Sequence, residues 1–111
     1  FVTGTLERLC VNPMQEKVND LLAMAQDAKD DFDSACGAAE NVRMKQAALR
    51  KFRGELVRLY QMQTEMAANV SSDSERALTD GLLSELERIS KAAHEAIGFT
   101  YTPLEQLAAL Q

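Results

Sequence analysis

The chain has 111 residues, of which 46% are hydrophobic and 26% charged, and its formal net charge is −5 at pH 7. This length provides for one hydrophobic core and therefore one domain, residues 1–111, and the apolar content is too high for a disordered chain. The acidic balance argues against nucleic acid as the principal partner, because phosphate contacts need a basic surface. No apolar run approaches the roughly 18 residues that a membrane span requires, and the few aromatic, Gly and Pro residues favour helices over a β-sandwich or barrel.

The first helix is predicted over about residues 5–36. Its apolar residues alternate steps of three and four, as in the seam of a seven-residue repeat. The seam residues are Val18, Leu21, Ala25, Ala28, Phe32 and Ala35. Gly37 is the expected end, because glycine takes the left-handed conformation easily. Pro13 leaves two possibilities open: it kinks this helix, or it occupies the first helical position after an Asn12 N-cap.

The second helix is predicted over about residues 38–70. Its seam residues are Val42, Leu49, Phe52, Leu56, Leu59 and Met66, with Lys45 and Gln63 in seam-like positions. At 1.5 Å per residue this helix would be roughly 48 Å long, which fits only an elongated bundle. Gly54 inside it predicts close packing or a slight bend.

A third helix, predicted over about residues 73–97, begins at a capping box. Ser72 is its N-cap, and the Glu75 side chain is expected to bond back to the Ser72 backbone N–H. Gly98 is the expected end. The seam residues are Leu78, Leu82, Leu86, Ile89, Ala93 and Ile97.

A short fourth helix is predicted over residues 103–110. Thr102 is its expected N-cap, and Pro103 stands at the first helical position. Leucines 104, 107 and 110 share one face, which either folds back on the other helices or docks on a partner.

These elements predict an all-α fold: an elongated, antiparallel, coiled-coil-like three-helix bundle of up-down-up topology, with a short C-terminal helix. Cys10 and Cys36 would lie roughly 39 Å apart on a single helix, which is far beyond disulfide reach. Two reduced cysteines are typical of a cytoplasmic protein.

The residue pattern predicts no catalytic residue, no cofactor and no metal site, and hence no enzyme. The one histidine, His94, has no metal ligand or nucleophile one helical turn away, so it is expected to be a solvated residue near a helix end. Three aspartates, Asp27, Asp30 and Asp31, share one helix face, but no second acidic motif faces them. They are expected to form a solvated surface.

Charge divides unevenly between the first two helices. Residues 16–33 contain six acidic and two basic side chains, whereas residues 43–58 contain six basic and one acidic. The basic residues are Arg43, Lys45, Arg50, Lys51, Arg53 and Arg58. Two interpretations stay open: the two helices pair their charges across the seam, or the basic residues form a surface for an acidic partner protein.

Two stretches resemble the tubulin-binding cofactor A family. Residues 3–9 (Thr-Gly-Thr-Leu-Glu-Arg-Leu) look like the family's T-G-x-x-x-R-L at the start of helix one. Residues 40–49 are similar to its entry into helix two, an acidic loop followed by a Lys-Gln pair, here Lys45-Gln46, and then a leucine, here Leu49. Residues 53–60 lack the proline that members usually carry midway through helix two, and residues 99–111 form an extra tail.

The resemblance implies a cytoplasmic, cytoskeleton-associated chaperone that captures β-tubulin after its release from the cytosolic chaperonin. Members bind through helical faces and use neither nucleotide nor metal. Lys45 and Gln46 are predicted binding residues because they lie in the matched motif, whereas Arg43, Arg50 and Arg53 are predicted from the charge pattern. A monomer is expected, and a dimer stays open. The alternative function is a generic helical adaptor, or a secretion or assembly protein, that inserts the amphipathic helix 102–110 into a partner groove.

Overall fold

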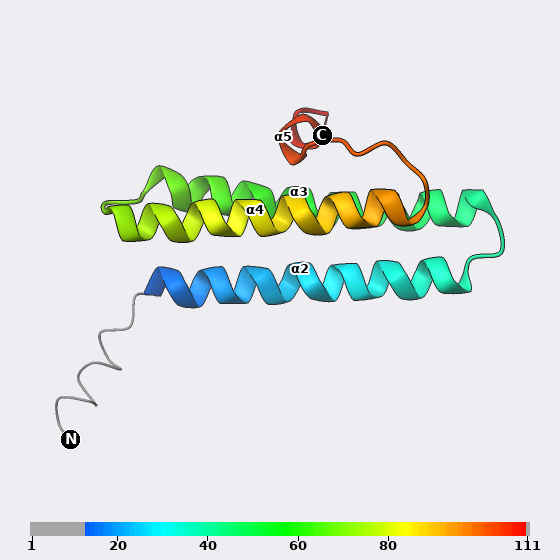
Figure 1. Ribbon diagram of the computed structural model, residues 1–111, viewed down its shortest axis with the longest axis horizontal. Helices are drawn as coiled ribbons and strands as arrows, with labels where there is room; N and C mark the ends of the chain where they lie inside the picture. The colour runs from blue at the N-terminus through cyan, green and yellow to red at the C-terminus, as the bar shows by residue number, and fades with distance from the viewer. Residues whose placement is uncertain (1–12, 111) are drawn as a thin grey trace, which may run out of the picture.

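The computed structural model describes residues 13–110, which form three long helices and one short one (Figure 1). The helices are α2 (Pro13–Ala38), α3 (Val42–Ala68), α4 (Asp73–Ala96) and α5 (Leu104–Ala109). No strand occurs in residues 13–110, and the long helices pack against one another in an elongated body with extents of 58 × 30 × 18 Å. The predicted all-α three-helix bundle is therefore confirmed. The part of the first helix predicted over residues 5–12, and with it the choice between a kink and an Asn12 cap, lies outside the described residues.

The chain runs along the bundle in α2, returns in α3 and runs forward again in α4 (Figure 1). Each of these helices contacts the other two, and α5 packs against α3. Figure 1 shows α5 on the side of α3 and α4 that faces away from α2. A single cluster of buried apolar side chains joins all four helices, with the rings of Phe32 and Phe52 5.1 Å apart between α2 and α3.

The predicted seams supply most of this core. Two predicted seam residues are exposed, however: Ala35, and Val42 with an exposed fraction of 62%. Both lie close to the α2–α3 connection, and Figure 1 shows that α2 and α3 extend there beyond the end of α4. Without the third helix to pack against, an apolar residue at a seam position stays in solvent.

The α2–α3 connection differs from its prediction. Gly37 does not end the first helix, because α2 continues to Ala38. The second helix begins four residues later than expected, at Val42, because the Asn41 side chain caps it by accepting a hydrogen bond of 3.0 Å from the Met44 backbone N–H. At Gly54 an added Cβ would meet nothing within 4 Å, so the predicted close packing is wrong.

Helix α4 begins after the predicted Ser72 N-cap and ends before Gly98 as predicted, but one hydrogen bond of the predicted capping box differs. The Ser72 hydroxyl accepts from the Glu75 backbone N–H at 3.2 Å, but the Glu75 carboxylate accepts from the backbone N–H and hydroxyl of Ser71 rather than from Ser72. These two hydrogen bonds lower the pKa of the Glu75 carboxyl. At the other end Gly98 has a φ of +75°, with Phe99 N–H bonded to the His94 carbonyl, which is the Schellman arrangement.

Helix α5 folds back on the bundle, with Leu104 and Leu107 buried and Leu110 exposed. The predicted Thr102 cap is wrong, since no side chain of the preceding segment caps this helix. Instead the Leu104 backbone N–H donates to the Glu87 carboxylate of α4 at 2.9 Å. A negative charge is favourable at a helix N-terminus, so the neighbouring helix supplies the acceptor that the local sequence was expected to provide.

Gly98→Ala should lower the free energy of unfolding by about 1–2 kcal/mol, because alanine pays a steric penalty in the left-handed conformation. Urea denaturation followed by circular dichroism measures this effect. Gly81→Ala is the matched control: it lies inside α4, where an added Cβ meets nothing within 4 Å, and should raise stability by up to about 1 kcal/mol. Effects of the same sign in both variants would contradict the assigned end of α4.

Candidate functional site

The candidate surface is the side of α3 that the rest of the bundle leaves uncovered. Helix α3 contacts α2, α4 and α5, and these contacts bury a wide arc of its side chains. The buried residues are Leu49, Phe52, Leu56, Val57, Leu59 and Gln63. Val57 lies outside the predicted seam, and its burial is in keeping with the packing of α5 on α3.

The five predicted binding residues do not share one face. Arg43, Gln46 and Arg50 are exposed, whereas Lys45 and Arg53 are half-buried. At 100° per residue Lys45 and Arg53 are only about 80° apart around the helix, since Lys45 is in line with the buried Gln63 and Arg53 lies between the buried Leu49 and Val57. The sequence-based surface therefore divides into three exposed residues and two that face neighbouring helices.

Lys45 lies near the C-terminal end of α2. Burial, with a smaller contribution from the Asp33 carboxylate, raises the pKa of the Cys36 thiol. The positive charges of Lys45 and Lys29 oppose this rise. The ammonium of Lys45 therefore stands close enough to α2 to act on one of its side chains, at the edge of the α2–α3 interface.

Arg53 faces α4 and binds the only histidine. Its Nε–H donates to Nε2 of His94 at 3.0 Å, and Nδ1 of His94 lies 2.7 Å from the Ser90 carbonyl oxygen. Because Nε2 accepts, the proton of the neutral ring is on Nδ1, which donates to that carbonyl. The Tyr101 ring stands nearly perpendicular to the imidazole, with ring centroids 5.9 Å apart.

The prediction of a solvated His94 is therefore wrong, since the side chain is fully buried. The sequence does not show this burial for two reasons. Arg53 and His94 are far apart in the chain, so their contact is not visible in a helical pattern. The seam of three helices also leaves one side of the bundle open, and α5 and its connector cover that side. Both ring nitrogens are bonded, so neither is available as a general base or a metal ligand. The nearby Ser90 hydroxyl is buried without a hydrogen-bond partner among the described residues.

Two further basic residues of α3, Lys51 and Arg58, are exposed, and Lys51 also lines a small hollow between α2 and α3 together with Asp31. Arg43, Arg50 and Arg58 follow one another at intervals of seven and eight residues, each close to two helical turns. We call Arg43, Arg50, Lys51 and Arg58 the basic row. A helical projection centred on the seam could have found Arg58 in the sequence, because it lies about 160° from Leu56, whereas Lys51 lies only about 100° from Phe52.

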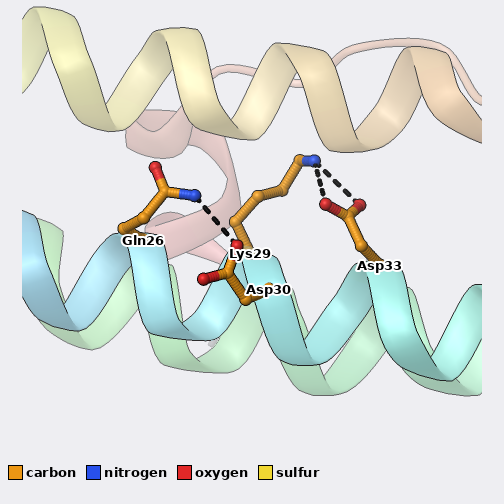
Figure 2. Close-up of polar contacts among 4 residues, drawn as sticks. All are labelled: Gln26, Lys29, Asp30 and Asp33. Carbon is orange, nitrogen blue, oxygen red and sulfur yellow. Dashed lines mark hydrogen bonds and ion pairs between the residues drawn. The ribbon is translucent and has the colours of Figure 1, made fainter.

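The described residues provide no partner for the basic row. Their ion pairs are Lys29–Asp33 and Glu85–Arg88, each within one helix and 2.8 and 2.7 Å long. Figure 2 shows the first of these, with Lys29 reaching along α2 to Asp33. No ion pair joins α2 and α3 within residues 13–110, although Asp31 and Lys51 line the same hollow between these helices.

The aspartates of α2 are exposed, and besides Asp33 a second one is engaged within its own helix. Asp30 accepts from the Gln26 amide at 3.1 Å (Figure 2). Within residues 13–110 no three His, Cys, Asp or Glu side chains are grouped so that they could hold a metal ion. None of the described helices is both long and apolar enough to cross a membrane.

Comparison with known proteins identifies no relative. No family model matches the chain, and neither curated proteins nor solved structures give a significant match. The resemblance to tubulin-binding cofactor A therefore stays a prediction from residues 3–9 and 40–49. Only the second stretch lies in the described part of the chain, where Lys45 is half-buried and Gln46 exposed.

Acidification should destabilise the bundle through His94. Burial lowers the pKa of this imidazole below its ordinary 6.5, and the nearby Arg53 charge lowers it further, against the hydrogen bond to Ser90. As the pH falls, His94 takes up a proton in the unfolded chain before it does so in the folded chain. The free energy of unfolding is therefore unaffected by His94 above about pH 6.5, and it decreases below that pH until the pKa of His94 in the folded chain is passed. Between pH 7.5 and 5.5 the loss should be at most about 1.4 kcal/mol.

Urea denaturation at the two pH values measures this loss, and His94→Gln is the control because glutamine can still accept from Arg53 but does not titrate. The acidic groups with lowered pKa, Glu75 and Glu85, titrate below this window. A wild-type chain and a His94→Gln variant that lose equal stability would show that His94 is not protected from protonation.

Proposed function

We propose that this chain is a non-catalytic binding protein that captures an acidic partner protein on the exposed face of α3. The observation that carries the proposal is the basic row, whose four cations are exposed and have no ion-pair partner among the described residues. On a chain with a net charge of −5, such a local excess of positive charge favours one orientation of approach to a negatively charged surface.

The geometry of the row suits a flat or helical partner surface. Gly54 lies between Arg50 and Arg58 and carries no side chain, so the partner can approach the α3 backbone there. The rigid helix also holds the guanidinium groups about two turns apart, and each can bond a carboxylate with two N–H groups.

For the partner we propose β-tubulin, in the cytoplasm, after its release from the chaperonin. Support for this choice is the resemblance of residues 3–9 and 40–49 to tubulin-binding cofactor A, together with the acidic character of tubulin. In this proposal Gln46 borders the contact, while Lys45 and Arg53 lie on the sides of α3 that face the rest of the bundle.

The adaptor alternative has less support. It requires the apolar face of the terminal helix to be free for a partner, yet Leu104 and Leu107 are buried against this chain's own bundle. Only Leu110 of that face is exposed.

Reversing three charges of the basic row, in the variant Arg43→Glu/Arg50→Glu/Arg58→Glu, should weaken the capture of β-tubulin by about tenfold or more. A single exposed ion pair contributes little to the binding free energy. The three charge reversals remove such pairs and in addition create repulsion between the variant and the acidic surface of the partner. Co-elution with β-tubulin diluted from denaturant, at several protein concentrations, measures the affinity.

The matched control is Lys17→Glu/Arg76→Glu/Lys91→Glu, which changes the net charge equally at exposed sites outside the row. It should retain most of the affinity. Equal losses in the two variants would reduce the effect to net charge and contradict a defined surface, and a wild-type chain that forms no complex would contradict β-tubulin as the partner.

A further inference from the structure

A second surface, independent of the basic row, lies at the opposite end of α3. There the first three turns of α2 and the last two turns of α3 enclose a groove of about 620 Å³, which also touches the start of α4. This volume is within the range of sites that bury several large apolar groups. No residue of the basic row lines this groove, although Arg58 lies one helical turn before Met62.

Methionine dominates the groove. Four of the chain's five methionines line it: Met14, Met24, Met62 and Met66. Exposed fractions of 52% at Met24 and 43% at Met62 are high for large apolar side chains, and the buried Leu21 lies at the base. Flexible thioether side chains adapt to apolar partners of different shapes, which is why methionine is common on surfaces that bind amphipathic helices.

The border of the groove is acidic. Asp20 of α2, Glu65 of α3 and Glu75 of α4 line it, against a single cation, Lys17. An apolar floor with a negative border selects a ligand that combines large apolar groups with flanking positive charges.

The walls indicate a helical ligand. Both are α-helices, whose backbone N–H and C=O groups are bonded internally, so they offer no edge to an extended strand. The ligand must satisfy its own backbone, as a helix does. The lining of α2 extends from Pro13 to Met24, or about 16 Å at 1.5 Å per residue, which corresponds to three turns of a ligand helix.

From these observations we infer that the methionine groove binds an amphipathic helix of a partner protein, with large apolar residues on one face and Lys or Arg beside them. Helix α5 already packs on α3 through leucines spaced by three residues, Leu104 and Leu107. The ligand helix packs in the same manner on the α2–α3 side.

A helical peptide of leucine and lysine, about four turns long, tests the inference when it is titrated into the full chain labelled with ¹³C at the methionine methyls. The resonances of Met24, Met62 and Met66 should shift and saturate together. Met44 should not shift, although its exposed fraction of 45% is close to those of Met24 and Met62. The same peptide with glutamate in place of lysine should bind about tenfold more weakly or not at all.

Met24→Glu/Met62→Glu should weaken peptide binding by about tenfold or more, with helicity unchanged because both residues are largely exposed. Met44→Glu, the matched control, should leave the affinity unchanged. The double variant Arg43→Glu/Arg50→Glu, whose changes lie away from the groove, should also retain the peptide, so failure of this inference is distinguishable from failure of the β-tubulin proposal.

Three results would overturn the inference. If the glutamate peptide bound as tightly as the lysine peptide, the acidic border would not select a positively charged ligand. Methyl shifts that depend on chain concentration alone would assign the groove to a second copy of this chain. Nuclear Overhauser contacts between the groove methyls and residues 1–12 that persist at saturating peptide would assign it to the chain's own N-terminal segment.

Discussion

The burial of α3 on three sides is the constraint on which the other features depend. Helices α2 and α4 pack on the seam and α5 packs on a further side, while about half of the α3 residues stay exposed. The cations of α3 therefore divide between its exposed side and the sides that the other helices cover. The basic row and the half-buried positions of Lys45 and Arg53 are two consequences of the same packing.

Polar groups inside the bundle help to fix how the helices are aligned. The buried Gln63 amide donates to the Thr79 carbonyl of α4 at 3.0 Å, and Arg53 reaches the buried His94 ring. A shift of α4 along α3 by one turn would leave these buried groups unpaired, at a cost of about 1–3 kcal/mol for each. The apolar seam supplies most of the stabilisation, and these two bonds select one alignment of α3 and α4 among those that the seven-residue repeat allows.

Sequence periodicity was sufficient for the architecture, because steps of three and four place Leu82, Leu86 and their counterparts on one side of each helix. It failed where a contact depends on a distant segment. The burial of His94 and Val57 requires α5, and the cap of α5 is Glu87 of another helix. Ala35 and Val42 satisfied the repeat but lie where the third helix has ended.

The candidate site was foreseen only in part. The excess of basic residues on the second helix was visible in the sequence, and Arg43, Gln46 and Arg50 are exposed as a binding surface requires. The sequence does not show which sides of the second helix α2 and α4 cover. For this reason the predicted surface includes Lys45 and Arg53, which are half-buried, and omits Lys51 and Arg58, which are exposed. The methionine groove had no sequence signal of its own, since methionine at helical spacing is also typical of core residues.

The side-chain Nε–H signals of the arginines offer the most direct test of the account, because each reports on one guanidinium group. They are recorded in a ¹H–¹⁵N spectrum of the free chain and again with β-tubulin. The account predicts that Arg43, Arg50 and Arg58 shift or broaden on binding, while Arg53 keeps its signal because its Nε–H is already bonded to His94. A complex in which the row is unchanged and Arg76 or Arg88 responds instead would contradict the claim that the uncovered face of α3 is the binding surface.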